Sequence, residues 1–274
     1  MQFDATGKVS LEQIYTQPDP RPYFGTLREL EYRIPQLAKP HFLKLIQEYR
    51  HATGIDVPTV LDIGCSYGIN AALLRCDATI DELYAHYCGA DAPDRSGLLA
   101  RDRDWISSRR QPKRIRFVGL DNSKPALSYA LAAGFIDDAV HADLEEHAPT
   151  EQQREQLAKV DLVISTGCIG YVGEKTLTRI ADASNKPWMA HYVLRMFPFG
   201  PIARRLAELG YETGPTVGLF KQRRFVSPQE QSLVLDTLSA VGVDPRGLEA
   251  DGWLYARLHI SRPRNRPASY GIRG

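Results

Sequence analysis

The chain has 274 residues, 43% of them hydrophobic and 24% charged, which suits one large globular domain and excludes a low-complexity chain. Lys and Arg number 34 against 33 Asp and Glu, a formal net charge of +1, so the basic excess typical of a nucleic-acid binder is missing. No basic segment followed by an apolar one opens the chain, and no apolar run approaches ~18 residues. We therefore expect a cytoplasmic monomer or homodimer with no nucleic-acid or membrane partner.

The four cysteines stand far apart, without a CxxC or a Cys/His spacing. Cys65 and Cys168 lie beside apolar runs, where small buried thiols are common. We expect neither a disulfide framework nor a bound metal ion.

Residues 1–54 are predicted to form an N-terminal lid segment. The first 25 residues are polar and interrupted by prolines, and they contain Tyr15 and Tyr23. Residues 40–54 then carry apolar side chains at helical spacing, and Gly54 is a suitable helix stop.

Strands and helices alternate through residues 55–262. Apolar runs predict strands at 59–64, 116–121, 139–144, 160–166, 187–197 and 252–260, and a basic, aromatic loop and strand at 216–226. Helices are expected from residue 69, at 122–134 and at 227–242, the last beginning with a capping box of Ser227 and Glu230. This order predicts an α/β domain with a doubly wound, mostly parallel seven-stranded sheet, helices on both faces and a closing strand compatible with antiparallel pairing. The basic residues 263–274 are expected to be a flexible tail.

The first predicted strand runs into a glycine-rich turn, VLDIGCSYG, at residues 60–68. Gly64 lets the chain turn off the strand, Gly68 allows a close approach to a ligand, and Asp62 brings a carboxylate to the crevice beyond the strand ends. A glycine-rich turn between a strand and a helix is often only a connection, so a ligand-binding role needs support from residues at the other strand ends.

Asp121 ends the second strand, RFVGLD, where a carboxylate can bind both hydroxyls of a ribose. It follows Asp62 by 59 positions, whereas the usual spacing is about 20. The surplus indicates a helical insertion at residues 76–112. Asp77 or Asp81 would be alternative ribose ligands, but no strand precedes either.

Two further strand ends carry polar residues. Asp143 in HADLEE is placed to reach the amine of an adenine, and DLVISTGCIGYV ends in the small, polar residues Ser165, Thr166 and Gly167. Taken in order with VLDIGCSYG and RFVGLD, these motifs resemble the S-adenosylmethionine site of the class I, Rossmann-like methyltransferases. The resemblance spans residues 58–260, with Ser66 replacing the middle glycine of the common DxGxGxG form.

The resemblance implies S-adenosylmethionine as cofactor, S-adenosylhomocysteine as product, and a set of binding residues. Asp62, Gly64, Ser66 and Gly68 would line the methionine end, Asp121 would bind the ribose, and Asn122, Asp143 and Leu144 would hold the adenine. Ser165 and Thr166 would lie near the sulfonium, and Cys65, Asn70 and Gly167 complete the predicted set.

Ser66 also bears on the choice of cofactor. A dinucleotide site needs the middle glycine so that the backbone can approach a pyrophosphate. S-adenosylmethionine has no phosphate, and a serine hydroxyl can hydrogen-bond its carboxylate. Ser66 therefore favours S-adenosylmethionine over NAD.

The predicted catalytic residues are His191, Tyr15 and Arg195. His191 in PWMAHYVLRMF is a candidate general base, with His141 and Glu145 as weaker ones. Arg195 is a candidate clamp for a carboxylate-bearing acceptor. Tyr15 or Tyr23 would place an aromatic face against the sulfonium as part of the lid.

The sequence thus predicts methyl transfer from S-adenosylmethionine to an O or N atom of a small molecule, in specialised metabolism. Three alternatives remain open: a non-methylating reaction that releases methylthioadenosine, an NAD(P)-dependent oxidoreductase, and a catalytically silent cofactor-binding protein.

Overall fold

The computed structural model describes residues 2–89, 94–109 and 114–264. Most of the predicted tail, residues 265–274, lies outside the described residues, as do two short stretches of the predicted insertion. Within the described residues no helix is both long and apolar enough to cross a membrane. All four cysteines are free thiols.

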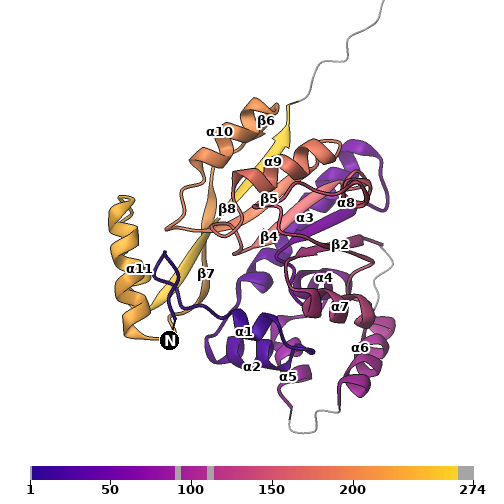
Figure 1. Ribbon diagram of the computed structural model, residues 1–274, viewed down its shortest axis with the longest axis horizontal. Helices are drawn as coiled ribbons and strands as arrows, with labels where there is room; N and C mark the ends of the chain where they lie inside the picture. Colours follow the sequence, from indigo (N-terminus) through magenta and orange to yellow (C-terminus); the bar gives the residue numbers. More distant parts are fainter. Residues whose placement is uncertain (1, 90–93, 110–113, 265–274) are drawn as a thin grey trace, which may run out of the picture.

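A twisted sheet forms the centre of the molecule (Figure 1). Along it lie β3 (Asp138–His141), β2 (Arg116–Asp121), β1 (Thr59–Ile63), β4 (Leu162–Thr166), β5 (Trp188–Leu194), β8 (Trp253–Pro263) and β6 (Tyr211–Thr213). The strands from β3 to β5 pair in parallel, and β8 runs antiparallel to β5. The predicted doubly wound, mostly parallel sheet is confirmed, but it has eight strands rather than seven. The strand that was not predicted is β6, whereas β7 (Val217–Arg224) was predicted and pairs with β8 off this path.

Alternate residues of the strands face two helical layers, as the pleat requires. Val60 and Ile164 belong to an apolar core that also contains side chains of α3 (Ile34–Thr53), α4 (Ile69–Arg75), α7 (Lys124–Ala133) and α11 (Pro228–Ala240). Leu61 and Val163 face the opposite core, which contains side chains of α8 (Glu151–Leu157), α9 (Glu174–Ala183) and α10 (Gly200–Glu208). Because both faces are covered, the central strands are buried along almost their whole length and are mostly apolar.

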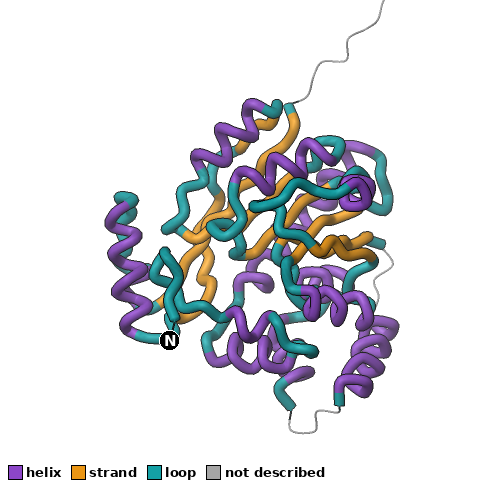
Figure 2. The backbone as a smooth tube through the Cα atoms, in the orientation of Figure 1, coloured by secondary structure: helices purple, strands orange, loops and turns teal. Residues whose placement is uncertain are grey.

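A third apolar cluster contains side chains from both the predicted lid segment and the predicted insertion. It contains side chains of α1 (Glu12–Tyr15) and α2 (Arg21–Glu29) from the N-terminal segment, and of α5 (Ile80–Tyr87) and α6 (Arg95–Arg109) from the insertion. Figure 2 shows these helices gathered beside one end of the sheet. Helices α1 and α2 therefore pack with the insertion as one unit, whereas α3, the rest of the predicted lid segment, packs on the sheet.

Two local predictions need correction. β3 ends at His141, so Asp143 lies in the following loop, where it accepts backbone hydrogen bonds from Glu145 and Glu146. Ser227 does cap α11 by accepting from the Glu230 amide, but the Glu230 carboxylate turns inward to Arg223 and completes no capping box.

Candidate functional site

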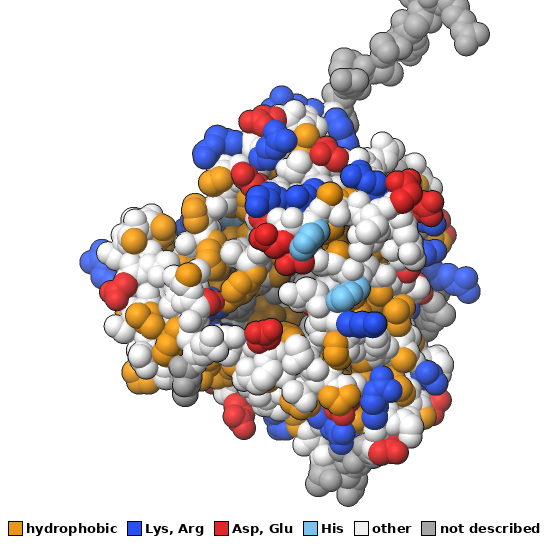
Figure 3. All heavy atoms as spheres, viewed as in Figure 1, with side chains coloured by type: hydrophobic (Ala, Val, Ile, Leu, Met, Phe, Trp, Pro, Cys, Tyr) orange, Lys and Arg blue, Asp and Glu red, His pale blue; other side chains and the backbone are white. Residues whose placement is uncertain are grey.

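A cavity of about 500 Å³ lies beyond the carboxyl ends of β1, β2 and β4. The molecular surface is hollowed near the middle of the face in Figure 3, where the first helices meet the sheet. The walls come from the glycine turn, from the loops after β2, β3 and β4, from two residues of β7, and from residues 4–16 of the N-terminal segment. A cavity of this size can enclose a cofactor or a small substrate.

The glycine turn has close contacts and a backbone conformation that restrict which residues can occupy it. Gly64 has φ +65°, and a Cβ there would stand 2.8 Å from Cys168 Cβ. Ser66 also has a positive φ, 50°, a left-handed conformation that costs a serine more than a glycine. Its amide donates to Asp121 Oδ2 at 2.8 Å, which binds the turn to the end of β2.

Asp121 lines the cavity beside this turn. Its two oxygens accept one backbone amide each, from Ser66 and from Ser123, both at 2.8 Å. Burial raises the pKa of this carboxyl, and the backbone hydrogen bonds oppose that shift. A carboxylate oxygen can accept more than one hydrogen bond, so Asp121 retains capacity for a ligand hydroxyl.

Several polar atoms around the turn have no partner. Asn70 Nδ2 donates to Asp62 Oδ1 at 3.0 Å and to Thr166 Oγ1 at 3.1 Å. Asn70 Oδ1, Ser66 Oγ and Asp62 Oδ2 are buried without a hydrogen bond in the described part of the chain. Unpaired buried polar atoms are costly, so Ser66 Oγ and Asn70 Oδ1, whose residues line the cavity, fit a polar ligand that would satisfy them.

Asp62 itself is fully buried and does not line the cavity; it positions Asn70, which does. Burial raises the pKa of Asp62 to about 7, although the hydrogen bond from Asn70 lowers it. Between its unfolded value of about 3.9 and the folded value, the native state binds a proton that the unfolded state has released. Asp62 therefore stabilises the ligand-free protein at low pH, and this contribution is lost as the pH rises toward 7.

We expect the free energy of unfolding of wild type, measured relative to Asp62→Asn, to fall between pH 5 and 7 and to level off above pH 8. Urea unfolding followed by circular dichroism across this range measures the difference. A constant difference at every pH would contradict the assignment.

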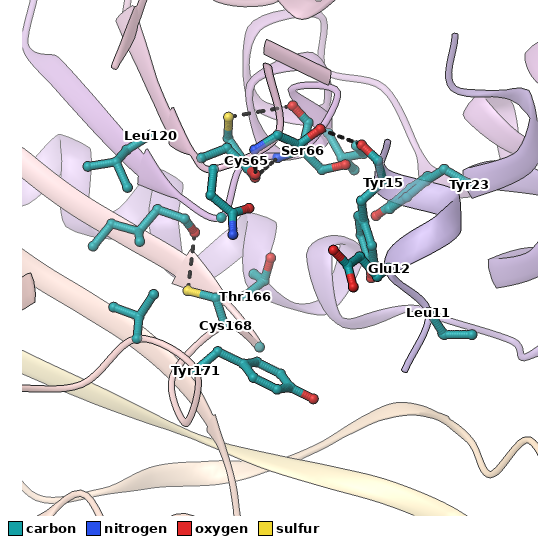
Figure 4. A pocket seen from close by; sticks show the side chains of 18 of the residues that line it. Leu11, Glu12, Tyr15, Tyr23, Cys65, Ser66, Leu120, Thr166, Cys168 and Tyr171 are labelled. Atoms are coloured by element: carbon teal, nitrogen blue, oxygen red, sulfur yellow. Dashed lines mark hydrogen bonds between the residues drawn. The ribbon is translucent and has the colours of Figure 1, made fainter. Parts of the chain in front are cut away.

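Most of the predicted cofactor residues lie on the cavity wall. Those that line it are Tyr15, Tyr23, Gly64, Cys65, Ser66, Asn70, Asp121, Asn122, Asp143, Leu144, Thr166 and Gly167. Figure 4 shows several of them around a common space.

Gly68 and Ser165 do not line the cavity. A Cβ on Gly68 would meet Phe135 Cβ at 3.0 Å, so this glycine allows the turn to pack on the segment after α7. Ser165 is fully buried and its hydroxyl bonds His191 Nδ1 at 2.8 Å. It faces the layer of α9 and α10, on the opposite side of β4 from the expected one.

The structure places the predicted base and clamp, His191 and Arg195, off the cavity wall. His191 is fully buried, and burial lowers its pKa to about 3. Arg195 follows the end of β5 and pairs with the buried Glu249, with Nη2 also donating to the Asp244 carbonyl.

Of the two weaker candidates for the general base, Glu145 lines the cavity and His141 does not. His141 is exposed, bonds the Asn122 carbonyl through Nε2 and does not line the cavity. Glu145 does line it, but its carboxylate accepts from the Gly173 amide and from the amide and hydroxyl of Thr176. These bonds assign Glu145 to fixing the loop before α9.

The N-terminal segment contributes more than was predicted. Besides Tyr15 and Tyr23, its Asp4, Lys8 and Glu12 line the cavity, as do Tyr171, Gln222 and Arg223 from much later in the chain. No local motif marks these residues. The one available signal was the basic, aromatic character of residues 216–226.

The sheet topology and the cavity beyond its strand ends define a Rossmann-like α/β protein. No protein-family model matches the chain, and no curated protein sequence matches it.

Solved structures are similar to it, however. Magnesium protoporphyrin IX methyltransferase from Synechocystis, with bound S-adenosylmethionine, is 11% identical over 82% of this chain and 79% of that one, with a TM-score of 0.40. An S-adenosylmethionine-dependent methyltransferase from Geobacter sulfurreducens, in complex with S-adenosylhomocysteine, is 16% identical over 89% and 98%, with a TM-score of 0.41. The plantazolicin methyltransferase BpumL is 12% identical over 93% and 95%, with a TM-score of 0.45.

At such identities and TM-scores these likenesses concern architecture alone.

Proposed function

We propose that this protein binds S-adenosylmethionine and transfers its methyl group to an O or N atom of a small molecule, in specialised metabolism. The observation that carries the proposal is the pairing of Asp121 with the Ser66 turn beside two unpartnered polar atoms of the cavity-lining residues, Ser66 Oγ and Asn70 Oδ1. This group lies at the carboxyl ends of the neighbouring strands β1 and β4, between which the strand order changes direction. Such a switch point is where open α/β sheets bind ligands.

The residues present fit the cofactor. Asp121 would bind the ribose hydroxyls, Asp143 and Leu144 the adenine, and Ser66 and Asn70 the amino-acid end. When bound, the cofactor supplies an activated methyl group. The protein's contribution is to hold the acceptor in line with that methyl and to exclude water, which needs no nucleophile on the chain.

The oxidoreductase alternative is disfavoured by the hydrogen bonds of the turn. A pyrophosphate needs free backbone amides at the start of the helix. Here the Gly64 and Cys65 amides donate to the Leu120 carbonyl, and the Gly68 amide donates to the Cys65 carbonyl. The Ser66 amide is taken by Asp121, so these four amides are not available to phosphate oxygens.

The proposal is tested by binding and by product analysis. Calorimetric titration should show binding of S-adenosylmethionine and S-adenosylhomocysteine, and none of NAD or NADP. Incubation with S-adenosylmethionine and a metabolite pool should release S-adenosylhomocysteine. Release of methylthioadenosine would instead favour the non-methylating alternative, and binding without any turnover would favour a silent partner.

We propose further that residues 1–54 act as the lid, with Tyr15 against the sulfonium. Tyr15 lines the cavity and contacts Tyr23 edge-on, with ring centroids 5.6 Å apart. Tyr23 is 4% exposed and packs on Phe24 and Tyr67. Replacing Tyr23 would therefore remove core packing and cost roughly 3–5 kcal/mol of stability, so Tyr15 is the cleaner position to test.

Tyr15→Ala should weaken S-adenosylmethionine binding by about tenfold, since a cation–π contact contributes about 0.5–2 kcal/mol. S-adenosylhomocysteine lacks the positive charge, so its affinity should fall less, and Tyr15→Phe should preserve both. Calorimetry on the three proteins measures this. Equal losses for the two ligands would remove the sulfonium contact from the proposal.

A further inference from the structure

A buried lysine on the cavity wall has no partner that neutralises its charge. Lys8 is 7% exposed and lines the cavity. No hydrogen bond or ion pair joins its Nζ to any residue in the described ranges, and its one close partner is the Tyr171 ring, 4.7 Å from Nζ to centroid. An ammonium group has three donors, so Lys8 presents unfilled hydrogen-bonding capacity to the cavity.

The carboxylates near Lys8 are already engaged. Asp4 accepts from the Thr6 amide and hydroxyl, from the Lys8 amide and from the Tyr171 hydroxyl. Glu230 accepts twice from the Arg223 guanidinium and twice from backbone amides. Neither carboxylate turns toward the Lys8 ammonium, although both lie close enough to affect it electrostatically.

A buried charge without a partner is costly, and an anion placed beside it removes most of that cost. We propose that the methyl acceptor carries an anionic group, a carboxylate or a phosphate, that binds the Lys8 ammonium inside the cavity. This inference rests on the proposed function, whose acceptor it describes. It gives Lys8 the clamp role that the sequence had suggested for Arg195.

The remaining wall suits an apolar body attached to that anion. Leu11, Tyr32 and Val172 line the same cavity. Tyr171 also lines it (Figure 4), and its ring is the one that Lys8 contacts. Arg223 adds a second cation to the wall, held in place by Glu230. An aromatic or aliphatic carboxylate or phosphate matches this combination.

The charged groups that face Lys8 give the site a pH dependence. Burial and the nearby Arg223 lower the pKa of Lys8 to about 8, against the opposing effects of Asp4, Glu230 and Cys168. Tyr171 faces it as an uncharged ring. Below this pKa the ammonium is present and binds anions, and as the pH rises through the pKa it is lost. A bound anion raises the pKa again.

The test uses three small probes of similar shape: benzoate, phenyl phosphate and the uncharged benzamide. Their binding to the full chain, with and without S-adenosylhomocysteine, is measured by ligand-observed NMR titration at pH 7. The variants are Lys8→Met, which keeps the length and removes the charge, and Lys8→Arg, which keeps the charge. Lys44→Met is the matched control, because the Lys44 side chain is 76% exposed on α3.

We expect wild type, Lys8→Arg and Lys44→Met to bind at least one anion at least tenfold more tightly than benzamide. Lys8→Met should lose that preference while binding benzamide as before, which shows that the variant is folded. Whichever anion binds more tightly identifies carboxylate or phosphate. The preference in wild type should disappear as the pH is raised from 7 to 10.

Two results would overturn the inference: wild type that binds neither anion better than benzamide, or Lys8→Met that keeps the preference. The proposed function has a separate readout. If S-adenosylhomocysteine does not bind, that function fails, while a Lys8-dependent anion preference would still stand as a measured property of the cavity.

Discussion

Asp121→Ala should abolish most of the affinity for S-adenosylhomocysteine, with a loss of about 30- to 1,000-fold. Hydrogen bonds to a charged acceptor contribute roughly 1.5–3 kcal/mol each, and every 1.4 kcal/mol is about tenfold in affinity. The variant also removes the acceptor of the Ser66 amide, so the turn loses the bond that holds its left-handed residue in place. Calorimetric titration measures the affinity, and circular dichroism confirms that the variant is folded.

Asp236→Ala is the matched control, since Asp236 is exposed on α11. It should leave the affinity unchanged. Asp121→Asn should fall between wild type and alanine, because the amide keeps one acceptor oxygen and loses the charge. An Asp121→Ala variant that binds within threefold of wild type would remove Asp121 from the site.

Glu230→Gln should lower the free energy of unfolding by about 3–5 kcal/mol, the usual cost of leaving one member of a buried ion pair without its partner. Glu230 is fully buried and its carboxylate accepts from Arg223 Nη2 at 2.7 Å. It also accepts the Val9 amide of the N-terminal segment at 2.9 Å. The loss should therefore loosen that segment and weaken ligand binding as well.

Urea unfolding measures the stability change. Glu48→Gln is the matched control, because Glu48 pairs with Arg262 at the surface and such pairs contribute only about 0–1 kcal/mol. Burial alone would raise the pKa of Glu230, but the Arg223 and backbone hydrogen bonds keep it below its usual value. This stabilisation should hold at neutral pH and be lost in acid. A Glu230→Gln variant as stable as Glu48→Gln would contradict the assigned role.

The sheet could be predicted from sequence because its strands are apolar on both faces. Runs such as LVIST in β4 are buried by two helical layers, and this gives a signal that needs no knowledge of partners. Helices with little apolar surface gave no such signal. In α8, EQQREQL, only Leu157 is buried, and α2, RPYFGTLRE, contains a proline and a glycine.

The two groups of residues that line the cavity also differed in how far they could be predicted from the sequence. The predicted ligand residues at the ends of β1 and β2 lie in short motifs whose backbone geometry fixes their direction. Lys8, Tyr171 and Arg223 meet from segments far apart in the chain, so no local pattern could bring them together. His191 and Ser165 were misplaced because a strand signal does not say which face of the sheet holds the ligand.

The hydrogen bonds that hold the N-terminal segment in place bear on the rate of product release. Residues 4–16 line the cavity, and five hydrogen bonds join them to other described segments: Asp4 to Tyr171, the Thr6 carbonyl to Thr237, the Val9 amide to Glu230, the Ile14 carbonyl to Tyr67, and the Tyr15 carbonyl to Ser123. At roughly 1 kcal/mol each, these bonds close the cavity firmly but reversibly. Their release would then set the residence time of the product, and a burst of one turnover would precede a slower steady rate.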